Sequence, residues 1–159
     1  MRGRAVAAAV LTCVAFVVGV GSPAGAVTSA KKADACTLIT PDDISEVLGI
    51  AGATKNEEVS ASVPGFCAYN LPGSGLLTVG IGKYTKITKS DFAVNSEQEG
   101  AERIPGAKKG FYIVADATRP EGSEADVVIG KKFLVIQVLT VVVDEDPFLE
   151  LINLAIDRV

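Results

Sequence analysis

The chain of 159 residues contains no histidine and no tryptophan. Histidine titrates near neutral pH and is the most frequent general base, as well as a common metal ligand. Its absence argues against histidine-dependent hydrolysis and against a zinc centre, so we expect no catalytic residues, no cofactor and no bound metal. A nucleic-acid-binding function is also disfavoured, because the formal net charge is -4 at pH 7.

Long apolar runs are scarce too, and the first of them predicts a signal peptide over residues 1–26. Arg2 and Arg4 precede an uncharged run from 5 to 21, and Ala24-Gly25-Ala26 supplies the small residues of a cleavage site. The run is short and rich in alanine for a spanning helix. We therefore expect a secreted protein with no stable membrane anchor. Anchoring through an uncleaved N-terminus, or through a lipid on Cys13, is the alternative.

The remaining chain predicts one small domain. Residues 27–35 are small and polar without periodicity, which is typical of a flexible lead-in. Residues 36–159 are numerous enough for a single hydrophobic core but not for several domains, and we expect a single secreted α+β domain there.

Three segments have helical signals. Thr40 and Pro41 form a helix start with two acids behind them, and Gly49 is placed to end that helix. A second helix is predicted from Thr88 to near Gly100. A third begins with Asp146 as N-cap and Pro147 as first helical residue, and its apolar stripe predicts packing on a sheet.

Strand signals lie between these helices, at residues 66–69, 77–81, 111–114, 125–129 and 133–143. Gly130-Lys131 predicts a two-residue hairpin between the last two of them. The segment 133–143 is apolar on both faces, which indicates a strand at the centre of a sheet that helices cover. It is too short to span a membrane.

Two cysteines remain after the signal peptide, Cys36 and Cys67. An even pair in an exported chain predicts a disulfide. Metal binding is the weaker alternative, because two thiols without histidine do not complete a zinc site.

The segments around these cysteines resemble a family. Cys36-Thr37-Leu38-Ile39-Thr40-Pro41-Asp42-Asp43 and the later Gly65-Phe66-Cys67-Ala68-Tyr69 are similar to segments of a large group of actinobacterial secreted proteins and lipoproteins of unassigned function. The resemblance implies an antiparallel sheet with N-terminal and C-terminal helices packed on it, as in extracytoplasmic sensor domains. It brings no catalytic residues. Many members look like lipoproteins, whereas the apolar stretch here continues beyond Cys13.

The candidate contact residues are Lys83, Tyr84, Lys86 and Lys89, the most basic stretch of the chain. Lysines on an exposed surface can meet an anionic wall polymer or a lipid head group. Alternatively, they can protect an edge strand from aggregation.

Two other patterns have structural explanations. Acidic residues cluster at 42–43, 57–58 and 144–146, and the first and last clusters lie at predicted helix starts, where the helix dipole favours them. The glycine spacing of Gly75 and Gly80 is that of a phosphate loop, but Ile81 stands where the lysine belongs, which excludes such a loop.

These observations predict a secreted extracytoplasmic binding or sensor-like domain that is not an enzyme. Its partner is an unknown envelope ligand or protein and not a nucleic acid. A small carboxylate-dependent hydrolase of the cell envelope, and a structural envelope protein that binds a protein partner, are the alternatives.

Overall fold

The computed structural model describes residues 34–116, 120 and 122–159. The predicted signal peptide, its cleavage site after Ala26, and Cys13 lie outside the described residues. The helices are η1 (Ala35–Thr37), α1 (Pro41–Leu48), α2 (Glu57–Ser62), η2 (Pro72–Ser74), α3 (Lys86–Ser96) and α4 (Glu145–Asp157). The strands are β1 (Thr54–Lys55), β2 (Phe66–Leu71), β3 (Gly75–Lys83), β4 (Glu102–Arg103), β5 (Gly110–Ile113), β6 (Gly122–Ile129) and β7 (Lys132–Leu139).

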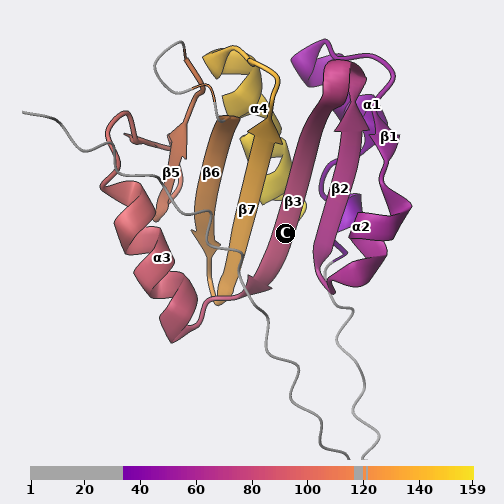
Figure 1. Cartoon of the computed structure of the whole chain (residues 1–159). Helices are drawn as coiled ribbons and strands as arrows, with labels where there is room; N and C mark the ends of the chain where they lie inside the picture. The colour runs from indigo at the N-terminus through magenta and orange to yellow at the C-terminus, as the bar shows by residue number, and fades with distance from the viewer. Residues whose placement is uncertain (1–33, 117–119, 121) are drawn as a thin grey trace, which may run out of the picture. The chain divides into compact units, whose positions relative to one another are not determined.

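The strands form a single sheet of seven, in the order β1-β2-β3-β7-β6-β5-β4 (Figure 1). Every neighbouring pair is antiparallel. β7 lies at the centre, as its two apolar faces predicted. Both edge strands, β1 and β4, are only two residues long, which leaves little unpaired backbone for another chain to join.

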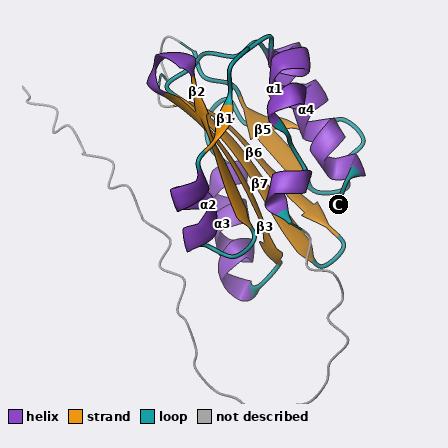
Figure 2. Cartoon of the chain, turned by 90° about the vertical axis from the view of Figure 1, so that its right-hand side faces the viewer, coloured by secondary structure: helices purple, strands orange, loops and turns teal. Residues whose placement is uncertain are grey.

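Helices cover both faces of the sheet (Figure 2). α1 and α4 lie on one face, while α2 and α3 lie on the other. The main core fills the space under α1 and α4, because alternate residues of the strands point to that side. Its largest fully buried side chains include Tyr69, Leu77, Leu134, Ile136, Ile44, Phe148, Leu151 and Ile152. The predicted α+β fold, with the first and last helices on an antiparallel sheet, is confirmed.

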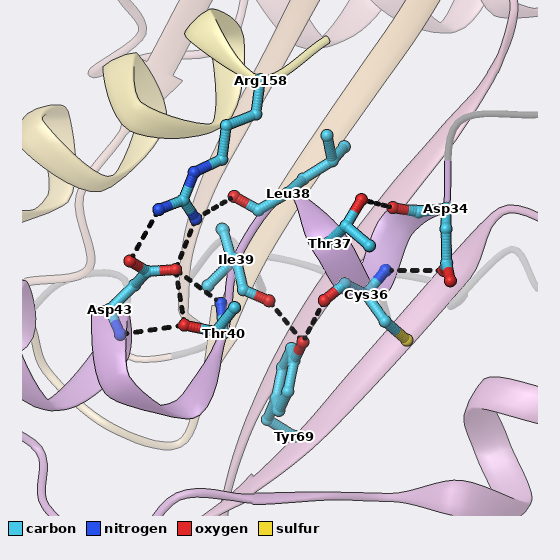
Figure 3. A network of polar contacts seen from close by, with 9 residues as sticks. All are labelled: Asp34, Cys36, Thr37, Leu38, Ile39, Thr40, Asp43, Tyr69 and Arg158. Atoms are coloured by element: carbon cyan, nitrogen blue, oxygen red, sulfur yellow. Dashed lines mark hydrogen bonds and ion pairs between the residues drawn. The ribbon is translucent and has the colours of Figure 1, made fainter.

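The start of α1 is a polar network that joins both ends of the domain (Figure 3). Thr40 and Asp43 form a reciprocal capping box, and Gly49 ends the helix at φ 67°, as expected. The guanidinium of Arg158, after α4, donates to Asp43 Oδ1 at 2.9 Å and to the Leu38 carbonyl oxygen at 3.1 Å. These bonds fix α4 against α1 at the edge of the core.

The predicted disulfide between Cys36 and Cys67 is present. It links the segment before α1 to β2, so residues far apart in sequence are joined at the core, where Cys67 is fully buried. The nearby Tyr69 hydroxyl donates to the carbonyl oxygens of Cys36 and Ile39. Asp34 caps η1 and Ala35 is fully buried, so these two residues do not belong to the flexible lead-in predicted for residues 27–35. The other residues of that predicted segment lie outside the described residues.

Several element boundaries differ from the prediction, and three of them have a clear local cause. α3 begins after Thr85, not Thr88, because Thr85 is the N-cap and Thr88 is its partner in the capping box. β7 ends at Leu139, before Thr140 turns into the left-handed region at φ 60°. α4 begins after Asp144, two residues before the predicted cap Asp146.

Candidate functional site

A cleft of about 340 Å³ lies between α3 and the start of β5. Its aromatic lining comes from Tyr84, Phe92 and Phe111. Phe92 of α3 lies at the centre of an aromatic cluster, with its ring centroid 5.4 Å from that of Phe111 and 6.5 Å from that of Tyr84. The ring of Tyr84 in turn packs at a tilt against that of Phe133 of β7, with the ring centroids 6.0 Å apart. Rigid aromatic surface of this kind suits a ligand with a flat apolar part.

The polar lining of the cleft is mostly basic. Lys89 comes from α3, Arg103 from β4, and Lys108 and Lys109 from the segment before β5. Glu102 is the single acidic residue of the described lining. The Lys89 ammonium nitrogen is 5.5 Å from the centre of the Tyr84 ring, a distance at which the cation and the ring attract each other. The cleft therefore joins an aromatic surface to positive charge in an acidic protein.

Basic residues also gather at the adjoining strand ends. Lys83 of β3 stands directly opposite Lys132 of β7, and Lys131 lies in the hairpin beside them. Like charges opposite each other on neighbouring strands are unfavourable. Lys132 is satisfied in part by a bond of 2.8 Å to the backbone oxygen of the terminal residue, Val159. Within the described part of the chain, the ion pairs use Lys55 and Arg158, which do not line the cleft.

The structure separates the four predicted contact residues into two pairs. Tyr84 and Lys89 line the cleft, whereas Lys83 and Lys86 are exposed outside its lining. The alternative explanation, in which these lysines protect an edge strand from aggregation, is wrong. β3 pairs with β2 and β7, and is therefore not an edge strand.

A second polar cluster lies on the same face of the sheet, beneath α3. Glu124 and Asp126 are two positions apart along β6, so both side chains point to this face. Asn95 of α3 donates to both, to Glu124 Oε1 at 3.2 Å and to Asp126 Oδ2 at 3.4 Å. Gln137 of β7 donates to the other oxygen of Glu124 at 3.0 Å. Asp126 is only 1% exposed.

Burial raises the pKa of Asp126 to about 7, with the negative charges of Glu124 and Asp91 adding to the effect. Asn95 opposes this shift, because its hydrogen bond favours the charged form. Among the described residues, no hydrogen bond reaches the second carboxylate oxygen of Asp126, Oδ1. A buried carboxyl in this position is a candidate functional group rather than a stabilising one.

The acidic clusters that the sequence analysis singled out lie at helix starts, away from Glu124 and Asp126. Asp43 belongs to the capping box, and Glu57 and Glu58 lie in the first turn of α2. Glu145 of α4 accepts a bond of 2.5 Å from the hydroxyl of Tyr112. Burial raises the pKa of Tyr112, and its hydrogen bonds to Glu145 and Glu102 add to the effect. Within the described residues, no three acidic or cysteine side chains converge as metal ligands.

The glycines of the rejected phosphate loop lie within β3. A Cβ atom on Gly75 would stand 2.3 Å from Val141 Cγ2, so this glycine permits the close approach of the chain after β7. Its role is packing and not phosphate binding.

Sequence reasoning missed most of the cleft and the whole carboxylate pair. Arg103, Lys108 and Lys109 are distant from Lys89 along the chain, and only the pairing of β5 with β6 brings them near α3. A local signal did exist for the carboxylates: Glu124 and Asp126 share one parity of a strand next to the central strand, where an acidic residue is unusual.

Comparison of the chain with models of known protein families, with curated proteins and with solved structures finds no match. No helix among the described residues has the length and apolar character needed to cross a membrane. The candidate site must therefore be interpreted from its own geometry.

Proposed function

We propose that the chain is an exported, non-catalytic binding domain whose cleft between α3 and β5 takes an anionic ligand with a flat apolar part. The observation that carries this proposal is the combination of three aromatic rings with Lys89, Lys108, Lys109 and Arg103 in one cleft. The basic side chains attract the anionic group through charge-assisted hydrogen bonds. The aromatic rings contact the flat apolar part of the same ligand.

Export is supported by the signal-peptide pattern of the sequence and by the disulfide, which persists in oxidising compartments. The resemblance to actinobacterial secreted proteins agrees with a location at the cell envelope. Envelope polymers and lipids carry phosphate and carboxylate groups, so they are a source of anionic ligands. The four basic side chains that line the cleft can bind such groups.

A hydrolytic function has less support. Glu124 and Asp126 share the amide of Asn95 as a hydrogen-bond donor, and Glu102 and Glu145 share the hydroxyl of Tyr112. Of the first pair, Asp126 is 1% exposed beneath α3. The scissile bond of a substrate would have to reach the carboxylate of Asp126 through α3. Binding without turnover is the simpler use of this site.

The proposal is tested by calorimetric titration with naphthalene-2-sulfonate, and with naphthalene-2-sulfonamide as its uncharged analogue. We expect the sulfonate to bind and the sulfonamide to bind at least about tenfold more weakly, since charge-assisted bonds are lost. Replacing Lys89, Lys108 and Lys109 together by glutamine should weaken sulfonate binding by about tenfold or more.

A matched variant removes the same charge from the same end of the sheet but outside the cleft, through Lys83→Gln, Lys86→Gln and Lys131→Gln. Its effect should stay below about threefold and should vanish at high salt, because only long-range attraction is lost. Equal binding of sulfonate and sulfonamide, or equal losses in the two variants, would contradict a specific anion site.

A further inference from the structure

Asp126 is a buried acid without full hydrogen bonding. It is 1% exposed, and within the described residues its Oδ1 atom has no hydrogen-bond partner. An ionised carboxylate in this position would lack compensation for the water it has lost. A protonated carboxyl fits better, because it carries no net charge into the interior.

The groups around Asp126 are negatively charged or neutral, and only the hydrogen bond from Asn95 favours its ionised form. On its own strand Glu124 faces the same side, and from α3 Asp91 acts on it as a second negative charge. The remaining neighbours in register are uncharged: Phe111 of β5 and Val135 of β7 stand opposite Asp126. Asn95 of α3 is the neutral donor between the two carboxyl groups. Burial and these two negative charges raise the pKa of Asp126 to about 7.

α3 is the element whose position depends on this pair. The helix has no fully buried residue, and its Ile87 and Val94 are 71% and 65% exposed. It is attached to the sheet by the ring contacts of Phe92 and by the bonds of Asn95. Gln98 donates to the carbonyl oxygen of that amide at 3.1 Å, which leaves its amino group to face the carboxyl groups. Few buried contacts make a segment able to open locally.

α3 is also one wall of the cleft, since it supplies Lys89, Phe92, Ala93 and Ser96 to the lining. From this arrangement we infer that the Glu124–Asp126 pair is an acid-dependent latch that holds α3 on the sheet when one proton is bound and thereby controls the ligand cleft. The latch itself rests on the buried pair, whereas its effect on binding rests on the proposed function of the cleft.

The direction of the effect follows from the exchange of protons. With α3 seated, Asp126 keeps its proton up to about pH 7, whereas a released helix would expose it to water and return it toward its ordinary pKa of 3.8. Between these values the seated state binds more protons, so rising pH shifts the equilibrium toward release. Above about pH 7 both states are ionised, and the equilibrium no longer changes with pH.

The test measures hydrogen-exchange protection of α3 amides by NMR at pH 5 and pH 8, corrected for intrinsic exchange rates and expressed relative to β7. We expect the relative protection of α3 in the wild type to fall by about tenfold or more across this range. In Asp126→Asn, which stays neutral, α3 should remain protected at both pH values. Glu150→Gln, which removes an exposed acid from α4, should behave like the wild type.

Two further readouts keep the outcome decisive. The carbon-13 shift of the Asp126 carboxyl in the wild type should titrate with the α3 amide shifts, even if the Asn variant does not fold. A carboxyl midpoint near the ordinary value of 3.8, or constant α3 protection, would overturn the latch. If α3 opens as expected but naphthalene-2-sulfonate, which stays ionised throughout, binds at no pH, then the proposed function fails and the latch stands.

Discussion

At the scale of single residues, the clearest stabilising contact is the ion pair of Asp43 with Arg158. The Arg158 guanidinium lowers the pKa of Asp43 to about 2, with bonds from Thr40 adding to this and partial burial opposing it. The pair joins the start of α1 to the end of α4, so one carboxylate serves a helix cap and a tertiary contact (Figure 3).

Asp43→Asn should lower the free energy of unfolding at pH 7 by about 1 kcal/mol, because part of the ion pair faces solvent and is screened. Since the folded pKa lies below the ordinary value of 3.8, the contribution is present above that value and is lost as pH falls through about 2. Urea unfolding at pH 7 and pH 2 measures this. The difference between wild type and variant should shrink at the lower pH.

Asp42→Asn is the matched control, because Asp42 is the exposed neighbour of Asp43 in the same helical turn. It loses only a favourable interaction with the helix dipole, which amounts to about 0.5 kcal/mol. If this variant is as unstable as Asp43→Asn, the bonds to Arg158 do not carry the effect.

The structural role of a residue can be predicted from the sequence where that role depends on neighbouring positions. Thr40, Pro41 and Gly49 have capping functions that depend on neighbours within a few positions, and each is found in its expected place. Arg158 carries no such local signal. Its partner Asp43 lies 115 residues away, and only the packing of α4 beside α1 brings them together.

At the scale of elements, the boundaries show which signals compete. Thr85 and Thr88 are both able to cap a helix, and their reciprocal bonds place the start at the earlier one. The apolar run continues after Leu139, but the backbone leaves the strand at Thr140, and Val142 is 73% exposed. Hydrophobic pattern alone does not reveal a change of backbone direction. The short strands β1 and β4 exist only through pairing with their neighbours.

The disulfide between η1 and β2 is the strongest link between elements. Replacing Cys36 and Cys67 by serine should lower the free energy of unfolding by about 3–4 kcal/mol, since the bond limits the unfolded ensemble over a long loop. Thermal unfolding followed by circular dichroism measures the loss. A reductant should lower the melting temperature of the wild type and leave that of the double variant unchanged. Two free thiols in the unfolded, unreduced wild type would contradict the pairing.

At the scale of the whole domain, the order of strands places the candidate site. β7 enters the sheet between β3 and β6, so the aromatic residue after β3, Tyr84, meets Phe133 of β7. α3 then runs over the same face of the sheet toward β5, where Phe92 reaches Phe111. Strand signals predicted these strands, but their order depends on packing of the complete chain. For this reason the sequence indicated Tyr84 and Lys89 and missed the other half of the cleft.

The central claim is that an anion binds in the cleft between α3 and β5. The most direct measurement is the NMR map of amide shifts during a titration with naphthalene-2-sulfonate at pH 5. The account predicts that the largest shifts fall on Lys89, Ser96, Lys109, Gly110 and Phe111, all of which line the cleft. Shifts centred instead on the second hollow of the surface, which Cys36, Ser60 and Gly65 line, would contradict it. The absence of any shift would do so as well.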